Sequence, residues 1–492
     1  MISVSSETMR KLEEHAFQHG HSPWALMQEA GLGISKHILR YFPHSKHAIA
    51  FLGKGNNAGD ALVALKHLKE AGWEVELRSA FPIGEWGELS KKAYTELGKP
   101  PLKTSVKPTA QTVLIDGLLG TGTQGSLRAP LDAIAEEINS LRAQSGATTV
   151  SLDIPSGIEN EAIHVTADHT LNIGLPKSST LGSEVVNSVG ALGLIPLSPI
   201  NTHQEAYQQI LAESNNPGFS MICPESLQRK RRNFDQHKGQ SGRVGIWAGS
   251  EGMLGAAALA ATASLKAGAG LITVFIPPTL YPVLATMVPA EVMVKPAIDP
   301  RVMLDMDFDA LIIGPGIGSP VPSLAERLLH VIEHSTVPTV IDADALNLIA
   351  AEEKLSVLNQ HSIITPHPGE FDRLFPKTQG SREERSQRVQ HNTPATLVYK
   401  GSRSIVCSPD SPLWVNSSGT PAMATAGQGD VLSGLIGGFC AQGYSKLEAA
   451  KLGVWIAGDA AQRALSTEST ETLSASSVIA SLADALNALP AT

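Results

Sequence analysis

The stretch His47-Ala-Ile-Ala-Phe-Leu-Gly-Lys-Gly-Asn-Asn-Ala-Gly-Asp60 joins a short apolar run to a glycine-rich loop. The apolar run predicts a buried strand, and residues 61–71 behind the loop predict a helix. The runs Val113–Asp116 and Thr149–Asp153 repeat this design, because each is an apolar segment that ends in an aspartate. Strands that alternate with helices predict parallel βαβ units, so we expect an α/β fold.

The rest of the chain is arranged in two blocks of this kind. Its 492 residues are too many for one hydrophobic core, which predicts two or three domains. Residues 203–219 are polar and contain the breaker Asn215-Asn-Pro-Gly218, so we expect domains at 1–218 and 219–492. In the second block, Arg243–Ala248 predicts a strand that leads into a helix over 255–269. Further strands are expected at 271–276, 310–313, 339–341, 362–364 and 396–399, with an antiparallel strand at 404–407.

The composition narrows the class of protein. A formal net charge of −9 argues against a general nucleic-acid binder, which needs a basic surface. Cys223, Cys407 and Cys440 are far apart and share no metal-ligand spacing, which indicates a reducing compartment. The sequence shows no signal peptide and no run of about 18 apolar residues that would span a membrane. We therefore expect a cytoplasmic protein that binds small molecules and has no nucleic-acid or membrane partner.

Three loops of the first block follow predicted strands, at the sheet edge where open α/β sheets bind their ligands. The loop 53–60 has the glycines that let backbone N–H groups approach an anion at a helix start. Asn57, Asp116 and Ser156 offer only hard oxygen ligands, which suit an alkali or alkaline-earth cation better than zinc. The alternative is that these residues only form turns and cap helices, as Asp, Asn and Ser often do.

Taken in order, Gly53–Asp60, Asp116–Gly122 and Leu152–Gly157 resemble the NAD(P)H-hydrate epimerase family. The resemblance implies a Rossmann-like three-layer domain in which Asp153 contacts the substrate and is the candidate acid/base group. It implies that a potassium ion is held by Asn57, Asp116 and Ser156. The implied substrate-binding residues are Asn56, Asn57, Ala58, Gly59, Asp60, Gly120, Thr121, Gly122, Thr123, Gln124, Gly125, Ser126 and Asp153. The family loop carries glycines where Ala58 and Ala61 stand, so binding requires that neither position has a positive φ.

In the second block, Gly427-Gln-Gly-Asp430 precedes an apolar helix over 431–442. Glycines before a helix N-terminus form an anion hole, and the adjacent aspartate can deprotonate a hydroxyl. Alone, this pattern is as often a capped helix as a site. The segments 314–318, 342–347, 365–370 and 400–404 each follow a predicted strand, and all should meet at one sheet edge.

This set of motifs is similar to ADP-dependent NAD(P)H-hydrate dehydratase, which implies a ribokinase-like α/β/α domain. The resemblance implies Asp430 as the catalytic base and Glu370 as the holder of a magnesium–water cluster near the phosphates. The implied substrate-binding residues are Ala256, Gly318, His367 and Asp430. The implied nucleotide-binding residues are Lys400, Gly401, Ser402, Arg403, Ser404 and Gly429, with ADP as the co-substrate.

Together the two resemblances imply a homo-oligomeric repair enzyme for hydrated NADH and NADPH. It would epimerise the R and S hydrates and then dehydrate the S hydrate with ADP, giving AMP and phosphate. A ribokinase-like small-molecule kinase is the rival hypothesis, because it shares the Gly-x-Gly-Asp motif. In that case the first domain would be a non-catalytic binding module.

Overall fold

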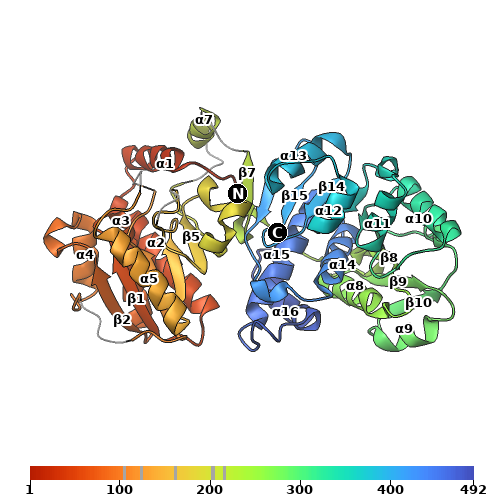
Figure 1. Cartoon of the computed structure of the whole chain (residues 1–492), viewed down its shortest axis with the longest axis horizontal. Coiled ribbons are helices and arrows are strands. Elements are labelled where there is room, and N and C mark those ends of the chain that lie inside the picture. The colour runs from red at the N-terminus through yellow and green to blue at the C-terminus, as the bar shows by residue number, and fades with distance from the viewer. Residues whose placement is uncertain (103–106, 122–125, 160–162, 201–204, 214–217, 492) are drawn as a thin grey trace. The chain divides into compact units, whose positions relative to one another are not determined.

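The computed structural model describes residues 1–102, 107–121, 126–159, 163–200, 205–213 and 218–491. The chain divides into two compact units, Met1–Met221 and Ile222–Thr492, whose helices and strands are labelled in Figure 1. No helix in these described ranges combines the length and the apolar character needed to cross a membrane.

The sheet of the first unit has six parallel strands in the order β2-β1-β3-β4-β5-β6. Its strands are β1 (His47–Leu52), β2 (Glu74–Ser79), β3 (Thr112–Gly117), β4 (Thr148–Leu152), β5 (His169–Ile173) and β6 (Ala191–Ile195). The predicted strands β1, β3 and β4 are confirmed. Strands β2, β5 and β6 were not predicted. Strand β2 lies at the edge of the sheet, is largely polar and has only Leu77 fully buried.

Helices cover both faces of this sheet. Along β1, Ala48, Ala50 and Leu52 pack against α2 and α3, whereas Ile49 and Phe51 pack against α5 on the opposite face. The alternation makes three layers, as expected for a Rossmann-like domain. The helices are α1 (Ser6–Gln18), α2 (Pro23–Tyr41), α3 (Asn56–Glu70), α4 (Glu88–Glu96), α5 (Leu131–Ser145), α6 (Val186–Val189) and α7 (Glu205–Glu213).

The sheet of the second unit is parallel from β10 to β14 in the order β10-β9-β8-β11-β12-β13-β14, and continues through the antiparallel strands β15 and β16. The strands are β8 (Arg243–Trp247), β9 (Leu271–Ile276), β10 (Val292–Pro296), β11 (Ala310–Ile313), β12 (Thr339–Ile341), β13 (Ser362–Ile364), β14 (Thr396–Tyr399), β15 (Ile405–Cys407) and β16 (Leu413–Asn416). All the strands predicted in this block are confirmed, including the antiparallel one. The boundary between the units falls inside β7 (Phe219–Ile222).

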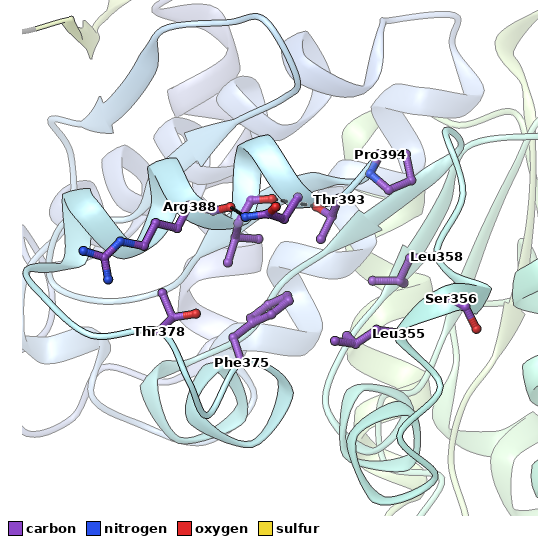
Figure 2. A pocket seen from close by; sticks show the side chains of 10 residues that line it. Leu355, Ser356, Leu358, Phe375, Thr378, Arg388, Thr393 and Pro394 are labelled. Carbon is purple, nitrogen blue, oxygen red and sulfur yellow. Dashed lines mark hydrogen bonds between the residues drawn. The ribbon is translucent and has the colours of Figure 1, made fainter.

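Two layers of helices cover the second sheet, with α8, α14 and α15 on one side and α10 to α13 on the other (Figure 1). The helices are α8 (Leu254–Ala267), α9 (Tyr281–Met287), α10 (Pro322–His334), α11 (Asp344–Ala351), α12 (Pro368–Leu374), α13 (Arg382–Asn392), α14 (Gln428–Ala441), α15 (Lys446–Ala464) and α16 (Ala475–Asn487). A small pocket beside α13 is lined by residues that include Phe375 and Arg388 (Figure 2). None of the site residues predicted above lines it.

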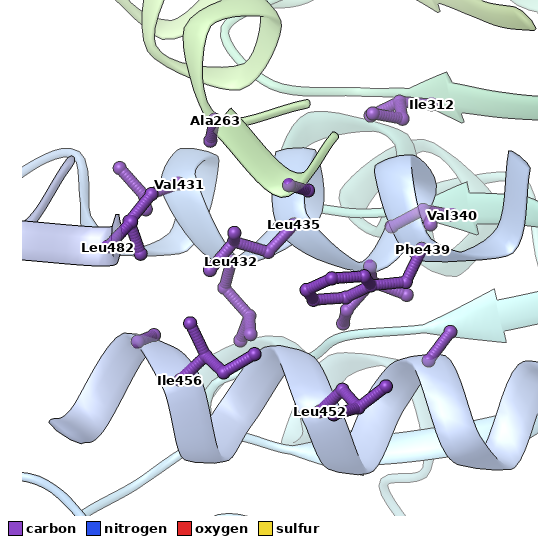
Figure 3. Packing of buried hydrophobic residues seen from close by; sticks show 14 of the residues in the cluster. Ala263, Ile312, Val340, Val431, Leu432, Leu435, Phe439, Leu452, Ile456 and Leu482 are labelled. Carbon is purple, nitrogen blue, oxygen red and sulfur yellow. The ribbon is translucent and has the colours of Figure 1, made fainter. Parts of the chain in front are cut away.

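Helix α14 is the centre of the second core (Figure 3). Its Val431, Leu435 and Phe439 are buried in one cluster with residues of α8, α15 and the sheet. A Cβ at Gly434 would collide with the Ala260 carbonyl, so this glycine allows α8 to approach closely. Close packing here fixes the position of the N-terminus of α14, which carries Gly429 and Asp430.

Two helices begin earlier than the sequence predicted. Helix α3 begins at Asn56 rather than at residue 61, and α14 begins at Gln428 rather than at 431. In each case a glycine, Gly55 or Gly427, is the N-cap, and the polar residues behind it form the first turn. The glycine-rich and polar composition of these segments predicts a loop. In the structure they form the first helical turn, whose backbone N–H groups lie at the edge of the sheet.

Candidate functional site

In the first unit, Asp116 and Ser156 form one buried network. Asp116 Oδ1 accepts hydrogen bonds from Ser156 Oγ (2.7 Å) and Leu118 N (3.2 Å), and Oδ2 accepts from Ser151 Oγ (2.9 Å) and Ser156 N (2.9 Å). Burial raises the pKa of Asp116, and the hydrogen bonds oppose that rise. The loops after β3 and β4 are therefore tied together by a carboxyl group and a hydroxyl group.

Asn57 lies in the first turn of α3 and approaches the same loops. Its side-chain Nδ2 donates to the Leu152 carbonyl at 3.3 Å. A Cβ added at Gly120 would lie 3.2 Å from Asp153 Oδ2 and 3.6 Å from Asn57 Oδ1, so the loop after β3 passes directly over both side chains. Ala58 and Ala61 lie inside α3 and have no positive φ. The two alanines that replace family glycines are thus compatible with the backbone.

Asp153 follows β4 in a left-handed conformation, with φ of +68°, and is 8% exposed. Its Oδ2 accepts from Thr121 N at 3.2 Å, and its Oδ1 accepts from Ile173 N at 3.3 Å. A non-glycine residue at positive φ is uncommon, and such residues cluster at functional sites. The two carboxylate oxygens are therefore held by the loop after β3 and by the last residue of β5.

Sequence reasoning missed the partner of Asp153, which is Lys177. This lysine is 1% exposed, and its ammonium forms an ion pair with Asp153 Oδ1 and donates to the Ile173 carbonyl. Lys177 stands in a Gly-Leu-Pro-Lys stretch about 25 residues after Asp153, so no local pattern links the two. Leaving either member of such a buried pair without its partner is costly.

Two more carboxyl groups face the pair from other elements. Burial raises the pKa of Asp60 well above its ordinary value, and the charges of Asp153 and Glu13 add to the rise while Lys177 opposes it. Burial likewise raises the pKa of Glu13 to about 7, with Lys177 opposing. A carboxyl group with a pKa near 7, such as that of Glu13, can both give and take a proton at neutral pH.

Not every predicted residue of this site can be placed. Gly122, Thr123, Gln124 and Gly125 lie outside the described residues. Ser126 follows them and is exposed. Asn56 is exposed at the start of α3, and Ala58 and Gly59 are buried behind it. The structure thus brings together Asn57, Asp60, Thr121 and Asp153 in the part that it describes.

In the second unit, Lys400 and Asp342 form the central contact. Lys400 Nζ lies 2.7 Å from Asp342 Oδ1, and Ser433 Oγ donates to Asp342 Oδ2 at 2.7 Å. Asp342 is 1% exposed. Burial disfavours the charged form of Lys400, but Asp342 and Glu370 outweigh it and raise the pKa of the lysine. The ammonium therefore stays charged beside the N-terminus of α14.

Gly429 and Asp430, in the first turn of α14, lie next to the ion pair of Lys400 and Asp342. A Cβ at Gly429 would lie 3.3 Å from Lys400 Nζ and 3.6 Å from Asp342 Oδ2. Burial raises the pKa of Asp430 to about 6; Asp342 and Asp344 add to the rise, and Lys400 opposes it. A carboxylate with such a pKa is ionised at neutral pH and is a stronger base than an exposed aspartate.

His367 and Glu370 form a capping box at the start of α12. His367 Nδ1 accepts from Gly369 N at 3.0 Å, and Glu370 Oε2 accepts from His367 N at 2.8 Å. The imidazole is half exposed, whereas the Glu370 carboxylate is buried, 3.8 Å from Lys400 Nζ. His367 Nε2 lies 3.4 Å from Glu370 Oε1, so both ring nitrogens are close to groups of the same helical turn.

Gly318 and Ala256 lie on the neighbouring loops. Gly318 N donates to Asp344 Oδ2 at 2.8 Å, which connects this loop with a carboxylate that also acts on Asp430. A Cβ at Gly316 would lie 2.9 Å from the Ala256 Cβ, so α8 begins against the same loop. Sequence reasoning quoted Asp342 and Asp344 as a motif but assigned them no role, and it missed Ser433.

The described residues contain no group of three or more His, Cys, Asp or Glu side chains that could hold a metal ion. A cation site among these residues would combine fewer than three such side chains with other oxygen ligands. The predicted sites, with Asn57, Asp116 and Ser156 in one unit and Glu370 in the other, are both of this type.

Comparison with known proteins gives the same division of the chain into two parts. Residues 24–179 match the family described as YjeF-related protein N-terminus, and residues 244–483 match the family described as NAD(P)H-hydrate dehydratase. The chain is 32% identical to the bifunctional NAD(P)H-hydrate repair enzyme Nnr of Moorella thermoacetica, over 94% of this chain and 92% of that protein. It is 31% identical to the enzyme of the same name from Coxiella burnetii, over 94% and 95%.

A solved structure supports the fold of the second unit. A ribokinase-like superfamily protein from Enterococcus faecalis matches with a TM-score of 0.50 and 25% identity, covering 56% of this chain and 97% of that one. The expected α/β class, with a Rossmann-like and a ribokinase-like part, is confirmed.

Proposed function

The chain belongs to the family of bifunctional NAD(P)H-hydrate repair enzymes, and on that premise we propose that it restores hydrated NADH and NADPH in two steps. The first step interconverts the R and S hydrates, and the second dehydrates the S hydrate at the expense of ADP. We assign the first step to residues 1–218 and the second to residues 219–492. The compact units Met1–Met221 and Ile222–Thr492 support this assignment.

One observation carries the dehydratase assignment. The N-terminus of α14 combines a glycine at 429, a carboxylate at 430 with its pKa raised to about 6, and the Lys400 ammonium below them. This is what transfer of a phosphoryl group to a hydroxyl requires: a base for the hydroxyl, and N–H groups and a cation for the phosphate charge.

The proposed reaction begins when Asp430 takes the proton of the substrate hydroxyl. The oxygen attacks the β-phosphorus of ADP, the bond to the bridging oxygen breaks, and AMP leaves. The new phosphate then leaves with the former hydroxyl oxygen, helped by the lone pair of the ring nitrogen. Loss of a proton from the adjacent ring carbon restores the dihydropyridine, so the products are NAD(P)H, AMP, phosphate and a proton.

The proposed ligands divide between the motifs. Ala256, Gly318, His367 and Asp430 contact the hydrated dinucleotide, and Lys400–Ser404 with Gly429 contact ADP. Magnesium usually binds to one or two carboxylates and to substrate phosphates, which fits the single buried Glu370. When bound, it would neutralise charge on the phosphates.

For the first unit we propose Asp153 as the acid/base group of the epimerase. Its fixed oxygens, the adjacent Lys177 and the carboxyls of Asp60 and Glu13 support a role in proton transfer. Asn56–Asp60 and Gly120–Ser126 are proposed to bind the substrate. Asn57, Asp116 and Ser156 supply hard oxygens and a single negative charge, which fits potassium. When bound, the ion would supply positive charge at the loops after β3 and β4.

The test uses a mixture of the hydrated NADH epimers with magnesium and either ADP or ATP. We expect the NADH absorbance to return in full with ADP, with release of AMP and phosphate. A stable phosphorylated hydrate without returning absorbance would instead identify a kinase. If neither ADP nor ATP supports any turnover, the dehydratase assignment is contradicted.

A further inference from the structure

Carbonyl groups in and next to the Lys400–Ser404 loop accept hydrogen bonds from an arginine of helix α13. Arg382, at the start of α13, donates from one guanidinium nitrogen to the carbonyls of Tyr399 (3.0 Å), Lys400 (3.1 Å) and Arg403 (3.4 Å). Tyr399 directly precedes the loop, Lys400 is its first residue, and Arg403 is its last residue but one. One side chain from outside the loop therefore sets the direction of several of its peptide groups.

The guanidinium is held in place by aromatic rings. It lies 4.2 Å from the centroid of the Tyr399 ring, and that ring is stacked on Phe371 at 4.2 Å. Arg385, one helical turn later, lies 4.5 Å from the centroid of the Phe371 ring and contacts the Tyr399 hydroxyl at 3.2 Å. Phe371 follows Glu370 in α12, so this stack also connects the loop with the capping box of His367.

The direction of the carbonyls determines the direction of the loop amides. In a trans peptide the C=O and the N–H of one plane point in opposite directions. Because the carbonyls of Lys400 and Arg403 point at Arg382, the N–H groups of Gly401 and Ser404 point away from it. Gly401 and Ser402 are exposed, so donors in this loop are accessible to a ligand.

Gly401 has a specific reason to be glycine. A Cβ built there would collide with the guanidinium of Arg382, and its backbone does not have a positive φ. The three atoms nearest to that Cβ all belong to the Arg382 guanidinium, and the backbone conformation itself would accept a side chain. An alanine at 401 and the arginine at 382 cannot both keep these positions.

We propose that Arg382 is a positioning residue for the nucleoside diphosphate: it holds the Lys400–Ser404 loop in the conformation that binds the nucleotide. It acts through the loop carbonyls and takes no part in the reaction. The inference rests on the proposed function only in that the nucleotide binds to this loop.

The first measurement is direct binding of ADP by calorimetry, which does not depend on turnover. We expect Arg382→Ala to weaken ADP binding by about tenfold or more, the size expected for loss of charged hydrogen bonds. Arg382→Lys, which keeps the charge but not the planar fork, should give an intermediate value. Arg388→Ala is the matched control, because Arg388 lies on the same helix, is exposed and donates to the Gln379 carbonyl, which is outside the Lys400–Ser404 loop.

The kinetics of dehydration separate positioning from general damage. The KM for ADP should rise in Arg382→Ala, whereas kcat at saturating ADP should stay within about threefold and the KM for the hydrate should not change. Gly401→Ala should also raise the KM for ADP, but should add nothing in the Arg382→Ala background, because the collision is then gone.

Unchanged ADP affinity in folded Arg382→Ala and Arg382→Lys would overturn the inference, as would independent, additive effects of the two substitutions. If the wild-type chain binds ADP but does not dehydrate the hydrate, the proposed function fails while the inference stands on the binding result. If the wild-type chain does not bind ADP, both fail.

Discussion

Asp430 is a carboxyl group whose surroundings favour its protonated form more than water does. Burial raises its pKa to about 6, and the nearby Asp342 adds to the rise. As the base in dehydration, Asp430 must be ionised. Dehydration should therefore be fully active above about pH 7 and should fall about tenfold per unit below pH 6 in the pH profile of kcat for the S hydrate.

Replacing Asp342 with asparagine tests the cause of this pKa. The substitution removes a negative charge near Asp430 and the closest partner of Lys400, and both changes lower the pKa of Asp430. We expect the acid limb of the kcat profile of Asp342→Asn to move to lower pH, with a lower maximum. Asp372→Asn, which removes an exposed carboxylate paired with Arg385, is the control and should leave the limb in place. If the acid limb of the kcat profile stays at the same pH in Asp342→Asn, the limb reports the ionisation of a group other than Asp430.

Lys177 offers the sharpest test in the first unit. Removal of one partner from a buried ion pair typically costs about 3–5 kcal/mol, so Lys177→Met should destabilise this unit and abolish epimerisation. Dehydration of the S hydrate should persist. Lys66→Met, which breaks a surface pair with Glu96, should cost less than about 1 kcal/mol.

A double substitution distinguishes pairing from packing. Asp153→Asn with Lys177→Met should be less destabilising than the sum of the two single changes, because the second change no longer leaves an unpaired charge. Urea denaturation of each variant measures this coupling. Strict additivity would show that the ion pair does not account for the effect.

At the scale of single residues, the sequence located groups that lie within or next to motifs. Asp153, Asp430, Gly429 and Lys400 were all predicted as site residues, and the structure places them at the carboxyl edges of the two sheets. Lys177 and Arg382 were not found, because their partners lie more than a dozen residues away in the chain. Contacts of this kind arise from the fold, and no spacing rule encodes them.

At the scale of elements, α2 and β5 pack two histidines against each other. His37 Nε2 lies 3.2 Å from His169 Nδ1, and Phe42 lies against the His169 ring. Burial lowers the pKa of His169 to about 4 and that of His37 well below its ordinary value. Both rings are therefore neutral in the folded protein at neutral pH.

This packing should make the first unit sensitive to acid. An unfolded histidine takes up its proton near pH 6.5, so the unfolded state gains stability as the pH falls through that value toward 4. The shift of His169 from 6.5 to about 4 corresponds to a loss of about 3 kcal/mol at pH 4. Thermal melts should show this loss, and His169→Gln should reduce the pH slope, whereas the exposed His19→Gln should not. Equal slopes in all three proteins would contradict the assignment.

Element prediction succeeded where burial makes the signal strong. Strands such as β9 and β11 are covered on both faces and appear as continuous apolar runs, whereas the edge strand β2 has no such run. The first turns of α3 and α14 were predicted as loops, since glycine, asparagine and aspartate are poor helix formers. Packing of α14 against α8 and α15 overrides that local preference.

At the scale of the whole molecule, each unit has its own sheet, core and candidate site. Each proposed reaction therefore uses residues of a single unit, and damage to one site should leave the other activity intact. This separation follows from the position of the groups at the edge of each sheet and does not depend on how the units are arranged.

The most direct test of the two-step account compares the wild-type chain with Asp153→Asn and Asp430→Asn. Each protein receives the mixed epimers of hydrated NADH with ADP and magnesium, and the NADH absorbance is followed to its end point, on a timescale short of spontaneous epimerisation. We expect full recovery for the wild type, a stall with one epimer left for Asp153→Asn, and no recovery for Asp430→Asn, which should still interconvert the epimers. Full recovery by Asp430→Asn, or loss of both activities in either folded variant, would contradict the account.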